Sequence, residues 1–244
     1  MRLAIVSDIH GNLTALDAVI ADLEGRGVDA VVHGGDLALA GCRGAEVIDR
    51  IRELGWAGIV GNTDELLWKP DDQDVQLRQA PRLGDLLRLL FVEYAPATRE
   101  ALGDERVTWL RGLPHAYGVG ETDLVHASPG DLWRAPLPDC DASELATTYD
   151  LLDGAIRVYG HIHRPFVRKL DRFTVANCGS VGSPFDGDPR ASYLLVDAGV
   201  AKVIRVEYDI EREVRALEHS SYPDSRRITE MRRSGKFIRV APRA

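Results

Sequence analysis

The sequence has few cysteines, no Cys-x-x-Cys pair and no long hydrophobic run. Its three cysteines are Cys42, Cys140 and Cys178, an odd number that argues against a disulfide framework and for a reducing compartment. No stretch approaches the ~20 apolar residues that a membrane-spanning helix needs. Met1 is followed at once by the apolar run Leu3–Val6, without the pattern of a signal peptide. We therefore expect a cytoplasmic protein with no membrane partner.

An excess of positive charge is also missing. The chain holds 30 Lys and Arg residues against 38 Asp and Glu residues, so its formal net charge is −8. A protein that binds DNA or a membrane surface without sequence preference normally presents a basic face. We therefore expect no stable nucleic-acid binding. A phosphate-containing substrate is compatible with this charge, because bound cations reverse the local field.

What is present is an ordinary globular composition, with strands and helices alternating in the first third. The 244 residues, 45 % of them hydrophobic, are enough for one large α/β domain. Apolar runs predict strands at 3–7, 29–33 and 57–60, and helical spacing predicts helices at 13–23 and 47–54. This pattern implies parallel strands joined by right-handed crossovers.

The rest of the chain is predicted to contain a helical insertion, a strand-rich part and a C-terminal extension. Residues 65–113, with a short helix at 105–110, form a cap-like helical insertion that we expect to lie over the site as a lid. Later strands are predicted at 116–119, 122–125, 156–159, 166–170, 174–177, 192–196 and 203–208. We expect one domain over residues 1–210 and a C-terminal helical extension and tail over 211–244.

Polar strings follow several of the predicted strands. They are Asp8-Ile9-His10, Gly35-Asp36, Gly61-Asn62, His126 and Gly160-His161-Ile162-His163. Ligands collect at the carboxyl ends of strands in open α/β sheets. Each string alone is more often a surface turn or a core histidine, but their joint occurrence after predicted strands favours one shared site.

The donor types restrict what such a site can bind. Two Asp, one Asn and four His offer oxygen and nitrogen ligands for two metal ions that share one carboxylate. Mixed His, Asp and Asn ligation without thiolate suits Mn²⁺, Fe²⁺, Zn²⁺ or Ni²⁺. The residues do not choose among these four ions.

These strings resemble the signature of the calcineurin-like metallophosphoesterases, over residues 1 to about 208. Within this superfamily, the sequence motifs resemble those of compact bacterial and archaeal phosphodiesterases and of dinucleoside polyphosphatases. The resemblance implies an α/β, four-layer fold in which helices flank a two-sheet β-sandwich, with the metal pair at one edge.

The resemblance also implies a role for each donor. It places Asp8, His10 and His163 on the first ion and Asn62, His126 and His161 on the second. Asp36 would bridge the two ions, with a bridging hydroxide as the nucleophile. Asp36, Asn62 and His126 are thereby the candidate catalytic residues.

One position departs from the pattern of many relatives, which carry Gly-Asn-His at the third string. Here Thr63 replaces that histidine, which is proposed to protonate the leaving group or hold the phosphate. A hydroxyl cannot replace imidazole as a general acid near neutral pH. We therefore expect activity on esters whose leaving group needs less protonation, such as aryl diesters or pyrophosphate links. His115 could substitute, although a surface or strand position explains it better.

Further residues are candidate substrate contacts with alternative explanations. Asn12 could touch substrate or cap a helix, and Asp64 could orient a metal-ligating side chain or cap the next helix. Thr63, Arg43 and Arg190 are the other candidate contacts.

The sequence thus predicts a phosphodiesterase for a small phosphoester of nucleotide or pyrophosphate type, possible as a homo-oligomer. A monoesterase or protein phosphatase of the same superfamily is the first alternative. A protein phosphatase is disfavoured because Gly35–Gly41 lacks the Asp-Arg-Gly phosphate clamp. A non-catalytic metal-binding scaffold is the second alternative.

Overall fold

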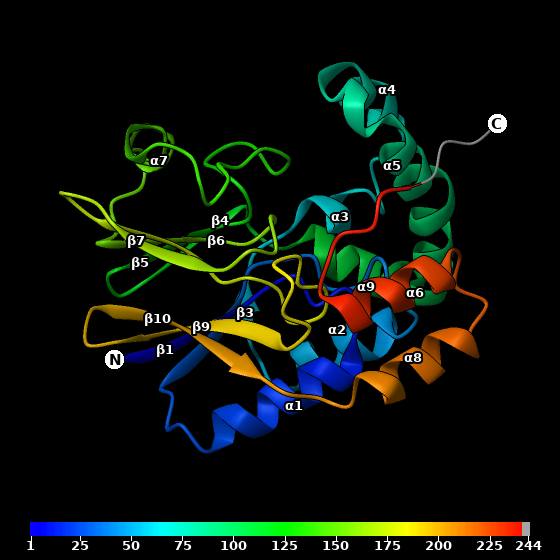
Figure 1. Cartoon of the computed structure of the whole chain (residues 1–244), viewed down its shortest axis with the longest axis horizontal. Coiled ribbons are helices and arrows are strands. Elements are labelled where there is room, and N and C mark those ends of the chain that lie inside the picture. Colours follow the sequence, from blue (N-terminus) through cyan, green and yellow to red (C-terminus); the bar gives the residue numbers. More distant parts are fainter. Residues whose placement is uncertain (241–244) are drawn as a thin grey trace.

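Two five-stranded sheets pack face to face in a computed structural model that describes residues 1–240 (Figure 1). The first sheet has the strand order β10-β9-β1-β2-β3. Its strands are β1 (Arg2–Val6), β2 (Ala30–His33), β3 (Ala57–Gly58), β9 (Ala191–Asp197) and β10 (Val200–Val206). The second sheet has the order β4-β5-β6-β8-β7. Its strands are β4 (Ala116–Val119), β5 (Thr122–Val125), β6 (Ile156–Tyr159), β7 (Phe166–Lys169) and β8 (Thr174–Asn177).

Helices cover both outer faces of this sandwich. They are α1 (Leu13–Glu24), α2 (Gly44–Glu53), α3 (Asn62–Glu65), α4 (Gln73–Gln79), α5 (Gly84–Leu89), α6 (Ala95–Arg111), α7 (Ala142–Tyr149), α8 (Ile210–Glu218) and α9 (Ser225–Ser234). The prediction of an α/β fold, with helices flanking a two-sheet sandwich, is confirmed. Among residues 1–240, no helix has the length and apolar character needed to cross a membrane.

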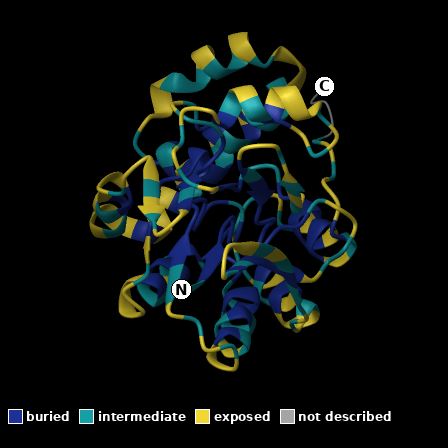
Figure 2. Ribbon diagram, turned by 90° about the vertical axis from the view of Figure 1, so that its left-hand side faces the viewer, coloured by how far each residue is buried: buried dark blue, intermediate teal, exposed yellow. Residues whose placement is uncertain are grey.

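The alternation of side chains along β1 builds two separate cores. Leu3 and Ile5 point between the sheets, where they meet Val158 of the second sheet. Ala4 and Val6 point the other way, into the cluster formed with the helices of the first sheet. Because both faces of the strand are covered, β1 is a continuous apolar run. The sheets lie in the buried interior of the molecule, drawn dark blue in Figure 2.

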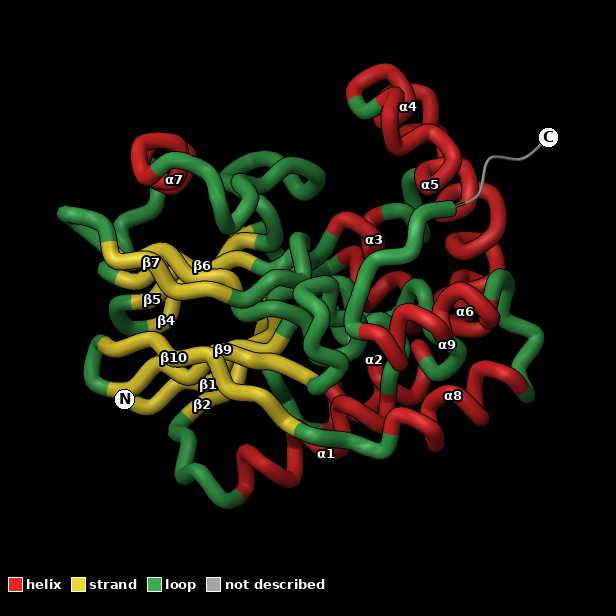
Figure 3. Tube along the Cα trace, in the orientation of Figure 1, coloured by secondary structure: helices red, strands yellow, loops and turns green. Residues whose placement is uncertain are grey.

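The strands that precede the polar strings run parallel. β2 pairs in parallel with β1 and with β3 in the first sheet, and β6 pairs in parallel with β5 and with β8 in the second. The loops that follow these strands gather between the strands and the helices (Figure 3). Both sheets therefore deliver the residues after their strands to one region.

Several element boundaries differ from the predictions. The helix expected at 105–110 is the second half of α6, which is interrupted at Gly103 by a backbone of φ 68° and ψ 169°. β10 begins at Val200 rather than at residue 203, and β3 covers only Ala57–Gly58. Neither α3 nor α7 was predicted, whereas α9 lies within the predicted C-terminal helical extension at 211–244, for which no separate helix bounds were given. The helix α7 packs on the second sheet through Leu145 and Tyr149.

Candidate metal centre

Four of the predicted ligands form a tight buried cluster. Asp8, His10, Asp36 and His163 each offer one ligand atom, and these atoms lie within 4.8 Å of one another. His163 Nε2 lies 3.1 Å from Asp8 Oδ1 and 3.2 Å from His10 Nε2. The loops after β1, β2 and β6, far apart in sequence, thus supply one site.

A second cluster adjoins the first and is formed by Asn62, His126 and His161. Asn62 Oδ1 lies 2.8 Å from His126 Nε2 and 3.0 Å from His161 Nδ1. Asp36 connects the two clusters, because its Oδ2 lies 3.7 Å from His10 Nε2 and its Oδ1 lies 3.5 Å from His126 Nε2. The structure therefore brings all seven predicted ligands together, with one carboxylate between the two groups.

The imidazole rings are held with one nitrogen aimed into the clusters. The Nδ1 atoms of His10 and His126 donate to the carbonyl oxygens of Leu39 and Gly34, each over 2.7 Å. The Nδ1 of His163 donates in the same way to the carbonyl oxygen of Ser183. These bonds select the tautomer whose Nε2 carries a lone pair.

This arrangement tests whether the residues fit a cation. With those tautomers, His10 Nε2 and His163 Nε2 face each other with two lone pairs beside the Asp8 carboxylate, and no hydrogen atom lies between them. Only a positive charge satisfies such a set of donors. The residues therefore fit a divalent metal ion.

The backbone of the ligand loops is unusual as well. Asp8, His10, Asp36, His161 and His163 all have φ between 50° and 63°, a left-handed conformation that non-glycine residues seldom adopt. Hydrogen bonds between the loops stabilise this backbone conformation, since Asp8 N donates to Gly35 O and His10 N donates to Asp36 O, both over 3.0 Å. Strain of this kind concentrates at functional sites.

Burial and neighbouring charges set the protonation of these groups. Burial lowers the pKa of His10 and of His161 to about 4, which keeps both rings neutral at neutral pH. Burial alone would raise the pKa of Asp8, but the imidazoles of His163, His126 and His10 outweigh it and hold that pKa well below its usual range. For His126 burial opposes the charged form, yet the Asp36 and Asp8 carboxylates raise its pKa. Asp8, His10 and His161 thus prefer the deprotonated form that metal binding requires, whereas His126 must give up a proton more readily held than usual.

Asp64 supports the centre through the backbone. Its Oδ2 accepts from the amides of Asp36 (2.8 Å) and Gly61 (3.0 Å), and its Oδ1 accepts from the amide of Leu37 (3.0 Å). Burial and the nearby Asp36 carboxylate raise the pKa of Asp64 to about 7. Asp64 therefore ties the loops after β2 and β3 together, so it both orients a ligand loop and caps α3.

Comparison with known proteins identifies this constellation. A sequence model described as the calcineurin-like phosphoesterase superfamily domain matches residues 1–199. The chain belongs to the calcineurin-like phosphoesterase superfamily. It is a metallophosphoesterase, as the resemblance of its polar strings predicted. The family depends on divalent metal ions, and the buried Asp and His cluster fits such an ion.

Relatives with 26–27% sequence identity cover most of the chain. An uncharacterized protein of Methanocaldococcus jannaschii is 27% identical, over 91% of this chain and 94% of its own length. The phosphodiesterase YfcE of Escherichia coli is 26% identical, over 84% of this chain and 91% of its own. The crystal structure of a metallophosphoesterase from Sphaerobacter thermophilus is 26% identical, covers 96% of this chain and 99% of its own, and superposes with a TM-score of 0.77.

Three of the predicted substrate contacts have other partners in this metallophosphoesterase. Asn12 caps α1 by accepting from Ala15 N over 3.0 Å, and its Nδ2 donates to Gly182 O over 3.1 Å. Arg43 forms an ion pair with the buried Glu213, and exposed Arg190 pairs with Asp188. None of the three lines the pocket at the metal centre. A contact of these residues with substrate therefore stays a prediction.

Thr63, in contrast, faces that pocket. Its amide donates to Asp36 Oδ1 over 2.9 Å, while its buried Oγ1 has no hydrogen-bond partner among residues 1–240. His115 is exposed and lies outside the pocket lining. A contact of the Thr63 hydroxyl with substrate therefore stays a prediction, and no hydrogen bond within residues 1–240 competes with it.

Sequence reasoning missed most of the pocket lining. Beside the metal centre the pocket is lined by Leu86, Leu90 and Tyr94 of the helical insertion, by Phe185, and by Arg227, Met231 and Phe237 of the C-terminal segment. The C-terminal segment runs from α9 toward α5 (Figure 1). No motif marks these residues, because they reach the site through the packing of three segments that are far apart in sequence.

The C-terminal helix is also bonded directly to the ligand loops. The buried Arg232 donates through Nη2 to His10 O over 3.0 Å and to Ala40 O over 2.9 Å. Tyr222, just before the helix, accepts at its hydroxyl from Ala40 N over 2.8 Å. The loops after β1 and β2 are thus held from outside by residues near the end of the chain.

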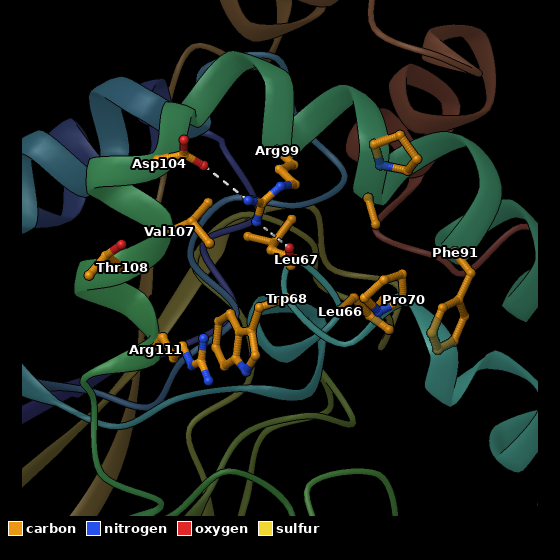
Figure 4. A pocket seen from close by; sticks show the side chains of 12 residues that line it. Leu66, Leu67, Trp68, Pro70, Phe91, Arg99, Asp104, Val107, Thr108 and Arg111 are labelled. Carbon is orange, nitrogen blue, oxygen red and sulfur yellow. Dashed lines mark hydrogen bonds and ion pairs between the residues drawn. The ribbon is translucent and has the colours of Figure 1, made fainter.

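A second, larger cavity lies away from the metal centre. It has a volume of about 480 Å³ and is lined by side chains of residues 66–70 and 91–111, among them Trp68 and Arg111 (Figure 4). Arg99 crosses it, donating to Leu67 O over 2.7 Å and pairing with Asp104. None of the seven predicted ligands lines this cavity. Although it is the larger of the two cavities, we therefore do not assign the metal site to it.

Proposed function

We propose that the protein is a metal-dependent phosphodiesterase that acts on nucleotide-type or pyrophosphate-linked substrates. The proposal assigns two divalent ions to the seven side chains, with Asp8, His10 and His163 on one ion and Asn62, His126 and His161 on the other. The observation that carries it is Asp36, whose two carboxylate oxygens face the two clusters separately. One carboxylate bridges two ions in this way when they lie ~3.5–4 Å apart.

Different residues of the chain would have separate roles in the reaction. Two bound divalent cations would lower the pKa of a water molecule and neutralise charge on the phosphate. Asp36, fixed by the amide of Thr63, would hold both ions at a constant separation. The free hydroxyl of Thr63 would donate to a phosphate oxygen, a charge-assisted hydrogen bond.

Diesters with a good leaving group are favoured by two observations, the pocket lining and the name of a relative. Apart from the imidazoles of the clusters, Tyr94 and Arg227 are the ionisable proton donors of the described lining, and the hydroxyls of Thr63 and Ser183 are too weakly acidic to protonate a leaving group. Burial raises the pKa of Tyr94, and its hydroxyl is already bonded to Arg227 and to Asp224. With no free general acid, esters with a good leaving group react best. The name of the Escherichia coli relative, a phosphodiesterase, supports the same reading.

Metal analysis together with a hydrolysis assay tests the proposal. We expect the purified chain to hold Mn, Fe, Zn or Ni, and to hydrolyse bis(p-nitrophenyl) phosphate faster than p-nitrophenyl phosphate when Mn²⁺ is supplied. Asp36→Asn and His161→Ala should each lower the rate by more than about a hundredfold, since even loss of an outer partner of a ligand costs 10–100-fold. His115→Ala, at an exposed histidine, is the matched control and should keep the rate.

Three outcomes would contradict the proposal. Unchanged turnover in both ligand variants would remove the metal centre from the reaction. A strong preference for the monoester would favour a phosphatase instead. Bound metal without turnover of any mono-, di- or pyrophosphate ester would favour a non-catalytic scaffold. A cytoplasmic location and a homo-oligomeric state stay predictions from the sequence.

A further inference from the structure

One side of the pocket at the metal centre is apolar. Leu86 and Leu90 of the helical insertion, Phe185, and Met231 and Phe237 of the C-terminal segment form what we call the apolar wall. Three parts of the chain that are far apart in sequence meet there. A surface of this composition stabilises an apolar partner and not a charged one.

The apolar wall begins at the ligand set itself. The ring of Phe185 stacks on His163, with centroids 4.3 Å apart and planes 8° apart. The ring of Phe237 meets Phe185 edge to face, with centroids 5.3 Å apart and planes 72° apart. Phe237 is still 38% exposed. Aromatic surface therefore adjoins one of the predicted metal ligands directly.

The wall offers no free positive charge to a second phosphate. Among the described residues that line the pocket, Arg227 is the one Arg or Lys side chain. Its Nε pairs with Asp224, its Nη2 donates to Tyr94 Oη over 2.8 Å, and its Nη1 donates to Ile238 O over 3.0 Å. Additional phosphate groups would thus lie against the wall unpaired, which is costly.

The pocket is also small. Its volume of about 120 Å³ is well below the ~300–1,000 Å³ of pockets that enclose drug-sized ligands. Beside the phosphate, the pocket has room for one ring, so the rest of a larger substrate would lie outside the pocket.

We propose that the apolar wall determines specificity by binding an aromatic group, an aryl ring or a nucleobase, attached to the reacting phosphate. This inference rests on the proposed phosphodiesterase function and narrows it. Organic diesters of nucleotide type fit the site, whereas pyrophosphate-linked substrates do not. Phe237, the exposed end of the wall, is the residue that contacts the ring.

Two inhibitors that differ only in the organic group isolate the wall. Phenylphosphonate and methylphosphonate carry the same phosphonate and no leaving group. We expect the Mn²⁺-loaded full chain to bind phenylphosphonate about tenfold more tightly in calorimetry, as burial of a ring on apolar surface predicts. Phe237→Ala should reduce this ratio at least threefold without changing the affinity for methylphosphonate. Leu137→Ala, at an exposed leucine outside the pocket, is the control and should keep the ratio.

Two substrates test the discrimination against pyrophosphate links. The p-nitrophenyl ester of thymidine 5′-phosphate should have a kcat/KM at least tenfold above that of diadenosine tetraphosphate. Phe237→Arg should narrow this gap, because it places a free guanidinium at the wall.

The outcomes separate this inference from the function on which it rests. Equal affinity for the two phosphonates, or an unchanged ratio in Phe237→Ala, overturns the role of the wall while phosphodiester hydrolysis stands. Diadenosine tetraphosphate turned over as well as the nucleotide diester does the same. Absence of turnover of every ester by the Mn²⁺-loaded protein overturns both.

Discussion

At the residue scale, the centre combines strained ligands with one unsatisfied hydroxyl. Five ligand residues have left-handed backbones, and such conformations persist only where surrounding bonds enforce them. Thr63 Oγ1 is buried near these ligands without a partner among residues 1–240. A buried polar atom without a partner costs stability, so its retention is explained best by a bond made only when substrate is present.

Replacing Thr63 should therefore separate activity from stability. Thr63→Val keeps the shape and removes the hydroxyl. We expect the free energy of unfolding to stay equal or rise, and kcat/KM for a phosphodiester to fall about tenfold or more, since a hydrogen bond to a charged group contributes ~1.5–3 kcal/mol. Thermal unfolding and steady-state kinetics measure the two effects.

Thr98→Val is the matched control, because the hydroxyl of Thr98 lies 2.8 Å from Tyr222 Oη. That variant should lose stability and keep its KM. Equal kinetics of Thr63→Val and the wild-type protein would show that the hydroxyl makes no contact with substrate.

At the element scale, α9 connects the end of the chain with the ligand loops at its beginning. Arg232 is almost fully buried and bonds the carbonyl groups of His10 and Ala40. The neighbouring Arg233 points outward and pairs with Glu211. Variants of these two arginines therefore distinguish a role in positioning the ligand loops from the general effect of positive charge on the helix.

Arg232→Met should weaken metal binding. Loss of the bonds to His10 O and Ala40 O loosens both ligand loops, and we expect the dissociation constant for Mn²⁺ to rise about tenfold, as for other outer partners of metal ligands. Isothermal titration calorimetry of the metal-free protein measures it. Arg233→Met should leave the dissociation constant unchanged, and identical values for both variants would contradict the positioning role of Arg232.

At the scale of the whole molecule, His33 links the stability of the fold to pH. Its ring is buried at the end of β2, both of its nitrogens lack a hydrogen-bond partner among residues 1–240, and burial lowers its pKa to about 4. The unfolded chain has a histidine pKa near 6.5. Below pH 6.5 the unfolded state therefore takes up a proton that the folded state refuses.

The sign of the effect follows from linkage. As the pH falls from 6.5 toward 4, His33 should lower the free energy of unfolding by up to about 1.4 kcal/mol per pH unit. His33→Phe should reduce the slope of this part of the profile by the share of one histidine, while the buried His10 and His161 keep theirs. Urea unfolding of metal-free protein at a series of pH values measures the slope. The slope is the readout, so a change in absolute stability from the larger ring does not affect it. His115→Phe, at an exposed position, should keep the wild-type slope. A slope in His33→Phe equal to that of the wild-type protein would contradict the prediction.

The sequence predicted the parts of the fold whose signal is local. The strands at 116–119, 122–125, 156–159 and 174–177 match the structure residue for residue, because each is a short run bounded by polar or turn residues. The bounds of α9 within the predicted helical extension at 211–244 were not recognised, since its buried residues include Arg227 and Arg232. A charged side chain becomes a core residue only when particular partners are present, and periodicity does not reveal them.

The seven donors and their order along the chain were determined by sequence alone, because parallel strands bring whatever follows them to a common edge. Only the tertiary structure decided the surroundings of that edge: which arginines are already paired, which hydroxyl is free, and which apolar side chains stand beside the phosphate site. Those properties depend on contacts such as Arg232 with His10 and Phe237 with Phe185. They arise when α5 and the C-terminal segment pack against loops distant in sequence, which no local pattern encodes.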